Sequence, residues 1–147
     1  MEWGFVIGLA GLVLCVFLCG MGSAIGLTKT GQTAAGVLSE DPKKFSKLLV
    51  LVVLPATQGI YGFVFAIVAS SSCTMGISLA TGLNILLASL PLTVTGLLTP
   101  VLQGKTSASC IQAVAKKDTL SGKLILFPAM IETYAILSLV VSLLLLP

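Results

Sequence analysis

The sequence predicts an all-α membrane protein with four transmembrane helices, arranged as two consecutive helical hairpins. Its mean hydropathy is +1.13 and 9% of its residues are charged, whereas an ordinary soluble domain has roughly 25% charged residues. The apolar runs lack the polar alternation of a membrane β-barrel, so helices are left as the way to satisfy their backbone groups in lipid. An ungapped internal repeat predicts the two hairpins.

The charge-free runs define the four helices. The run from Trp3 to Thr28 holds one span, about residues 4–27, because a spanning helix needs about 20 apolar residues. The run from Leu48 to Gly104 holds two spans, about 48–70 and 78–101, divided by the polar stretch SSSCTMG at 70–76. The fourth span, about 124–146, contains a single charge, Glu132. The acidic Glu2 and the lack of a lysine before the first span argue against a cleaved signal peptide.

The lysines predict the orientation. All eight lie between the first and second spans or between the third and fourth: Lys29, Lys43, Lys44, Lys47, Lys105, Lys116, Lys117 and Lys123. By the positive-inside rule these two connections face the cytoplasm, and both termini and the 70–76 loop face the opposite side. The net charge of +3 is therefore attributed to the lysines that set the orientation in the membrane.

The repeat divides the chain into hairpins 1–73 and 74–147. A shift of 73 residues aligns Gly31 with Gly104, Thr33 with Thr106, Ala35 with Ala108, Lys43 and Lys44 with Lys116 and Lys117, Pro55 with Pro128, Ala56 with Ala129, and Tyr61 with Tyr134. Both halves carry lysines on the same side, so the repeat is parallel, unlike the inverted repeats of many transporters. Glu132 aligns with Gly59, so only the second hairpin has the carboxylate.

Glu132 is the main candidate functional residue, because a charged side chain at bilayer depth costs about 2.5–3.5 kcal/mol on insertion scales and usually marks a functional site. Thr57 and Tyr61 share one face of the second span, Gln58 is beside them, and Gln103 ends the third span. Single polar groups of this kind more often hydrogen-bond between helices. Two amides, however, bring four groups that need partners. Carboxylate, hydroxyl and amide oxygens suit a hard cation, whereas a proton needs only the carboxylate.

Proline and glycine mark two further features. Pro55 and Pro128 each remove a backbone N–H inside a span, which predicts a kink and could free a carbonyl near the site. The first span is rich in small residues, which allow close helix packing and suit the inner wall of a ring: Gly4, Gly8, Gly11, Gly20, Gly22, Ser23, Ala24 and Gly26.

Several functions have no support in the sequence. The chain has no histidine, no CxxC or HExxH motif and no P-loop, so hydrolysis of ATP cannot reside in it. It has no arginine and no basic, aromatic patch for nucleic acid. Cys15, Cys19, Cys73 and Cys110 form no obvious pair and are expected to pack as small apolar residues.

Five motifs together resemble the proteolipid rotor subunit, called K or c, of V-type (A/V-type) ATPases in its four-helix form. They are GSAIG (22–26), LPATQGIYGF (54–63), GLNILLASLP (82–91), QGKTSA (103–108) and ETYAIL (132–137), and they span essentially the whole chain. The resemblance implies a homo-oligomeric membrane ring that turns against a stator, with one ion carried on Glu132 of each subunit. It also implies a stator subunit with an arginine, a central stalk docked on the cytoplasmic connections 28–47 and 103–123, surrounding lipid, and a prokaryotic plasma membrane.

The same resemblance implies the residues that hold the ion. In sodium-transporting members they are a glutamate, a threonine, two glutamines and a backbone carbonyl, with a tyrosine that supports the glutamate. By motif position these are Glu132, Thr57, Gln58, Gln103, the Leu54 carbonyl and Tyr61. Because every side chain of the set is present, sodium is favoured over a proton as the carried ion, and no cofactor is expected.

Two other classes remain as alternatives. A small four-helix proton-coupled secondary transporter also has one key carboxylate, but usually in its first helix, and the lysine distribution argues against a dual topology. A structural proteolipid would explain the duplication but leaves the set around Glu132 without a role.

Overall fold

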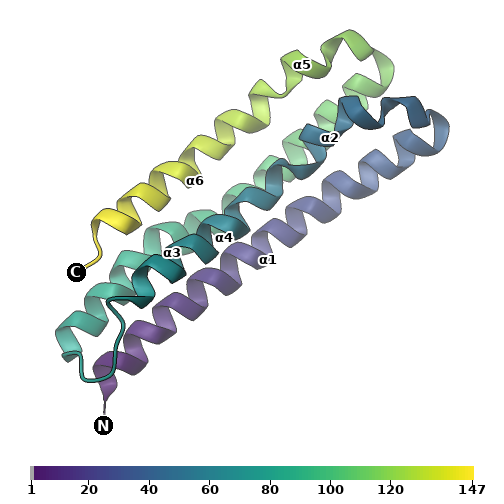
Figure 1. Cartoon of the computed structure of the whole chain (residues 1–147). Helices are drawn as coiled ribbons and strands as arrows, with labels where there is room; N and C mark the ends of the chain where they lie inside the picture. The colour runs from purple at the N-terminus through teal and green to yellow at the C-terminus, as the bar shows by residue number, and fades with distance from the viewer. Residues whose placement is uncertain (1) are drawn as a thin grey trace.

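The computed structural model describes residues 2–147 and consists of four long helical spans (Figure 1). Two are single helices of 38 residues each, α1 (Trp3–Glu40) and α4 (Leu79–Lys116). The second span, Pro42–Ser70, contains α2 (Phe45–Val53) and α3 (Thr57–Ser70), with 3-10 turns at Pro42–Lys44 and Leu54–Ala56. The fourth, Asp118–Leu144, contains a 3-10 turn at Asp118–Leu120, α5 (Ser121–Leu124) and α6 (Leu126–Leu144). All four are long and apolar enough to cross a membrane, which confirms the predicted fold class.

The two unbroken helices extend well beyond the predicted spans 4–27 and 78–101. At a rise of about 1.5 Å per residue, 38 residues give about 57 Å, roughly twice the 30 Å hydrocarbon thickness. The connections expected at 28–47 and 103–123 are therefore mostly helical. Lysine, glutamine and alanine favour helix, and the first break comes only at Asp41, which precedes Pro42 and accepts the Lys43 backbone N–H at 3.2 Å.

At the end of the molecule opposite to Asp41 and Pro42, a loop at 71–78 joins α3 to α4 and lies near both termini (Figure 1). Gly76 in this loop has a φ of +88°, the left-handed region that glycine tolerates best. Ser78 then caps α4, because its side chain accepts the Thr81 N–H at 3.1 Å. The polar break predicted at 70–76 is thus confirmed as the turn of the chain.

Glycines bring α1 and α4 into close contact along their length. A Cβ atom on Gly22 would lie 2.5 Å from the Leu97 carbonyl oxygen, and one on Gly104 would lie 2.7 Å from the Gly26 Cα. Such distances are too short for any other residue without a shift of the helices. α3 packs beside α1, and α6 packs beside α4, so both shorter helices pack against the glycine-rich pair.

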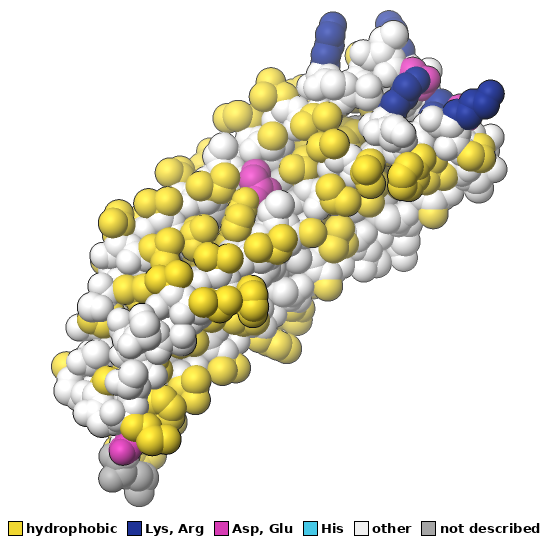
Figure 2. Space-filling model, in the orientation of Figure 1, with side chains coloured by type: hydrophobic (Ala, Val, Ile, Leu, Met, Phe, Trp, Pro, Cys, Tyr) yellow, Lys and Arg dark blue, Asp and Glu magenta, His cyan; other side chains and the backbone are white. Residues whose placement is uncertain are grey.

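The surface matches a membrane setting. In Figure 2, apolar side chains cover most of the length of the visible face, and lysines gather at one end of it. This lysine end comprises residues 29–47 and 105–123. The four apolar spans and the exposed apolar side chains are therefore those of an integral, multi-pass membrane protein.

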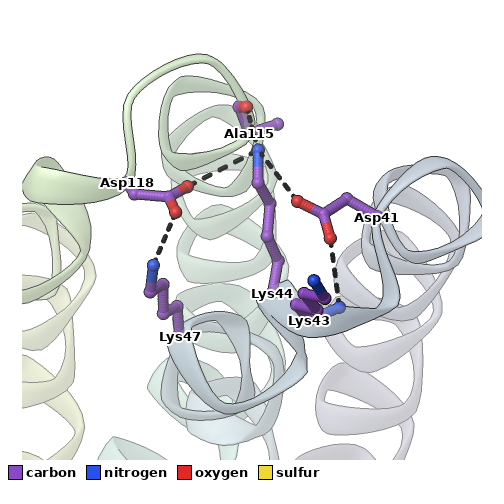
Figure 3. Close-up of polar contacts among 6 residues, drawn as sticks. All are labelled: Asp41, Lys43, Lys44, Lys47, Ala115 and Asp118. Atoms are coloured by element: carbon purple, nitrogen blue, oxygen red, sulfur yellow. Dashed lines mark hydrogen bonds and ion pairs between the residues drawn. The ribbon is translucent and has the colours of Figure 1, made fainter.

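Ion pairs join the two connections at the lysine end (Figure 3). Lys47 Nζ donates to Asp118 Oδ2 at 2.5 Å, and Lys44 Nζ lies 3.5 Å from Asp118 Oδ1. Lys44 also donates to the Ala115 carbonyl in the last turn of α4. A cation at this position interacts favourably with the negative end of the helix dipole. Asp118 lies outside the apolar stretch 124–146, and the hydrogen bond from Lys47 lowers its pKa below the ordinary value. These lysines therefore tie the hairpins together rather than only solvating helix ends.

Candidate ion-binding site

Glu132 lies on the buried side of α6, facing α3 and α4. The residue is 8% exposed, although α6 as a whole presents many apolar side chains to the surroundings. In the described part of the chain, the ion pairs all involve Lys44 or Lys47 at the lysine end, and none involves Glu132. The carboxylate is therefore surrounded by neutral groups.

Four side chains donate hydrogen bonds to this carboxylate. Thr57 Oγ1 and Tyr61 OH lie 2.5 Å and 2.6 Å from Glu132 Oε1. Gln58 Nε2 and Gln103 Nε2 lie 3.0 Å and 2.8 Å from Glu132 Oε2. Each carboxylate oxygen thus has two donors, which is the kind of environment that a buried charged group requires.

Further contacts link the donors to one another and to the backbone. Gln58 Nε2 donates to Gln103 Oε1 at 2.9 Å, and Gln103 Nε2 also contacts the Pro128 carbonyl at 2.9 Å. Thr57 Oγ1 lies 2.9 Å from the Leu54 carbonyl. Both glutamines are fully buried. The structure thus brings together all six residues singled out from the sequence: Leu54, Thr57, Gln58, Tyr61, Gln103 and Glu132.

The proline breaks explain why this geometry forms locally. Pro55 lies in the 3-10 turn Leu54–Ala56, so α2 ends at Val53 and α3 begins at Thr57. The Leu54 carbonyl and the Thr57 and Gln58 side chains consequently stand at the start of a new helix. In the fourth span, α5 ends at Leu124 and α6 begins at Leu126, shortly before Pro128. A short interruption of the α-helix thus accompanies each of the two prolines.

Three contributors were missed from the sequence: the Pro128 carbonyl and the hydroxyls of Ser23 and Thr30. Ser23 Oγ accepts the Gly59 backbone N–H at 2.8 Å, and Thr30 Oγ1 donates to the Val52 carbonyl at 2.9 Å. One signal was available, since the 73-residue shift aligns Thr30 with Gln103. A buried hydroxyl at the position of a site glutamine could have drawn attention to Thr30.

The arrangement favours binding of a small monovalent cation. One carboxylate supplies a single negative charge, and two hydroxyls and two amide nitrogens contact it. The Leu54 carbonyl and the amide oxygens of both glutamines lie next to these donors. Oxygen ligands of this type suit hard cations. The described residues include no cluster of three or more His, Cys, Asp or Glu that could hold a metal ion, so the oxygen set at Glu132 is of a different type from a multi-carboxylate or thiolate site.

Comparison with known proteins identifies the family. The model of the ATP synthase C-subunit family matches residues 4–69 and, separately, residues 75–145. The chain is 44% identical over 142 residues to the V-type sodium ATPase subunit K of Enterococcus hirae, covering 97% of this chain and 91% of that protein. It is 36% identical to the A-type ATP synthase subunit K of Methanocaldococcus jannaschii (96% of this chain, 62% of that protein).

A more distant relative is the 16 kDa proteolipid of the V-type proton ATPase of Rattus norvegicus, 27% identical over 98% of this chain and 93% of that protein. These matches confirm the resemblance inferred from the motifs. They run through both halves of the chain, including the segments that carry the candidate site. The chain therefore belongs to the ATP synthase C-subunit family of membrane proteolipids.

Proposed function

We propose that the chain is one subunit of the membrane rotor ring of a rotary V-type ATPase, and that it carries one sodium ion on Glu132. The observation that carries the proposal is the set of four donors and the neighbouring carbonyl around one buried carboxylate. Similarity to a protein named as a V-type sodium ATPase subunit supports sodium as the ion. Family membership supports a non-catalytic, ion-translocating role, with ATP hydrolysis or synthesis on other subunits.

The polar set favours sodium over a proton. A proton would need only the carboxylate, whereas a sodium ion needs several further oxygens. The Thr57 hydroxyl lies 2.9 Å from the Leu54 carbonyl and 3.3 Å from Gln58 Oε1, and Gln103 Oε1 accepts the Gln58 amide at 2.9 Å. Oxygens that could complete a sodium site therefore lie next to the groups that hold the carboxylate. Tyr61 supports the carboxylate through its hydroxyl and is not required as an ion ligand.

The charge of the site can couple ion exchange to rotation of the ring. A loaded site is neutral and can pass through lipid at low cost, whereas an isolated charge at this depth costs about 2.5–3.5 kcal/mol on insertion scales. An empty site is then stable only beside a cation, which an arginine on the stator subunit would supply. The site therefore releases its ion where the stator lies and takes up another before it returns to lipid.

The lysine end is the proposed docking face for a central stalk in the cytoplasm. The positive-inside rule places this end in the cytoplasm and both termini on the other side. One carboxylate for every four helices gives a ring fewer ions per turn than one carboxylate for every two. Since moving each charge against 100 mV costs about 2.3 kcal/mol, fewer ions per turn permit a steeper gradient for each ATP.

The test is labelling with a hydrophobic carbodiimide, which reacts with protonated carboxyls in apolar surroundings. Membranes containing the intact protein are labelled across a range of pH, with sodium chloride or with potassium chloride at the same ionic strength, and modification is located by mass. The exposed Glu40 serves as an internal control for selectivity, because a carboxylate in water should remain unlabelled. We expect labelling at Glu132 that sodium suppresses and potassium does not.

The other possible labelling results would change or overturn the proposal. Labelling that follows pH but ignores sodium would replace sodium by a proton as the carried ion. No labelling of Glu132 under any condition would overturn the rotor proposal as a whole. A Glu132→Gln variant must lose the modification, which shows that the signal comes from this carboxyl.

A further inference from the structure

The helix break at Pro55 leaves backbone groups that need partners from outside their own helix. The first N–H groups of any helix and its last carbonyls have no acceptor or donor within that helix. At this break, α2 ends at Val53 and α3 begins at Thr57, so both kinds of group occur within a few residues. Ala56, which precedes α3, offers no side chain to cap it.

Ser23 on α1 provides the missing cap for α3. Its Oγ accepts the backbone N–H of Gly59, in the first turn of α3, at 2.8 Å. Ser23 is 5% exposed, so water does not compete freely for this bond. Serine is a favoured capping residue, but here it lies 36 residues away in sequence, on another helix.

Thr30 provides the corresponding cap for the end of α2. Its hydroxyl donates to the Val52 carbonyl, in the last turn of α2, at 2.9 Å, and is fully buried. The hydroxyl also lies 3.1 Å from the Leu27 carbonyl of its own helix. Ser23 and Thr30 are seven residues apart, two helical turns, so they lie on the same face of α1.

We propose that Ser23 and Thr30 are positioning residues that hold the break at Pro55 and thereby set the affinity of the site at Glu132. The segment between their two anchor points contains the Leu54 carbonyl and the side chains of Thr57 and Gln58. These groups approach Glu132 only if the end of α2 and the start of α3 keep their present separation. The proposal rests on the ion-binding role given to Glu132.

The internal repeat supports a specific role over general helix adhesion. In the second hairpin the aligned positions are Gly96, which has no hydroxyl, and Gln103, which reaches the Pro128 carbonyl and the carboxylate itself. In both hairpins, then, a polar side chain on the long first helix, α1 or α4, reaches a carbonyl near the proline of the second helix. The paired hydroxyls occur only at the break that supplies Thr57 and Gln58.

The test compares variants that remove each anchor with a matched control on the same helix. Ser23→Ala and Thr30→Val remove the anchors, Thr30→Ser keeps the hydroxyl, and Thr33→Val removes a hydroxyl that bonds only its own helix, to the Lys29 carbonyl. Two quantities are measured on the assembled protein in membranes or detergent. They are the sodium concentration that half-suppresses carbodiimide labelling of Glu132, and amide hydrogen exchange of residues 54–61.

We expect Ser23→Ala and Thr30→Val each to raise the half-suppressing sodium concentration by about tenfold, since each leaves one buried backbone group unpaired. Both should also speed exchange of residues 54–61. Thr30→Ser and Thr33→Val should match the unsubstituted protein. The inference is overturned if exchange of 54–61 is unchanged in both anchor variants, or if the control changes equally. If the unsubstituted protein shows no suppression by sodium, the sodium assignment fails, and the exchange comparison alone then decides the positioning role.

Discussion

Replacement of Gln103 by leucine tests the proposed ion site most directly. Gln103 is fully buried and holds Glu132 Oε2 at 2.8 Å, the Pro128 carbonyl at 2.9 Å and the Gln58 amide at 2.9 Å. Leucine has a similar size, so the helices can still pack, but it has no polar atoms. The variant removes an amide oxygen that would bind the cation and leaves the Gln58 amide with one partner fewer.

The expected magnitude follows from the bonds to the carboxylate. A hydrogen bond to a charged group contributes about 1.5–3 kcal/mol. Loss of about 2 kcal/mol from ion binding corresponds to roughly a 30-fold weaker affinity, since each 1.4 kcal/mol is a factor of ten. We therefore expect the sodium concentration that half-suppresses carbodiimide labelling of Glu132 to rise by roughly 30-fold, while labelling in the absence of sodium persists.

Gln112→Leu is the matched control, because Gln112 lies on the same helix but is exposed at the lysine end. Native mass of the assembled protein shows whether each variant still forms the same oligomer. A change of less than twofold in Gln103→Leu, with assembly intact, would refute the assignment of Gln103 to the ion site. An equal change in Gln112→Leu would show that the effect is not local.

Three further outcomes are expected. Tyr61→Phe removes the 2.6 Å hydrogen bond to the carboxylate and should raise the carbodiimide labelling rate about fivefold; Tyr134→Phe, at the aligned but 64% exposed position, should not. Gly22→Ala should lower the free energy of unfolding of the assembly by about 1–3 kcal/mol through overpacking, and so lower the midpoint of thermal unfolding. Gly36→Ala, where a Cβ meets nothing within 4 Å, should leave that midpoint unchanged. The lowered pKa of Asp118 means that its ion pairs stabilise the protein at neutral pH and are lost as pH falls through that pKa. Asp118→Asn should therefore lower the melting temperature slightly at pH 7 in low salt, and the difference from the unsubstituted protein should vanish in acid or 1 M salt.

Much of the fold was predictable because lipid imposes simple rules on sequence. Charge-free runs of sufficient length predicted four spans, and the break at 70–76 was visible as a polar gap. The extension of α1 to Glu40 was not predicted, since hydropathy reports where a helix leaves the membrane and not where it ends. Lysine and glutamine mark the edge of lipid yet favour helix, so the helix continues into water until Asp41 and Pro42.

The candidate site was predictable in its members but not in its supports. Glu132, Gln58 and Gln103 stand out because such groups are costly in lipid, and the structure brings them together. Ser23 and Thr30 do not stand out, because the hydroxyls of helical Ser and Thr can equally bond their own backbone, as those of Thr28 and Thr33 do. Their partners are backbone groups released by Pro55, and which helix faces that break depends on tertiary packing.

The distribution of the site over both halves of the chain has a consequence for how the proposed ring would be built. Thr57 and Tyr61 come from residues 1–73, whereas Gln103 and Glu132 come from residues 74–147. A pool of separate hairpins could join in any order, and two carboxylate-bearing hairpins side by side would both lack the donors that Thr57 and Tyr61 supply. Fusion in one polypeptide holds the unlike halves at an effective concentration on the millimolar scale, so strict alternation is encoded in the gene and needs no sorting during assembly.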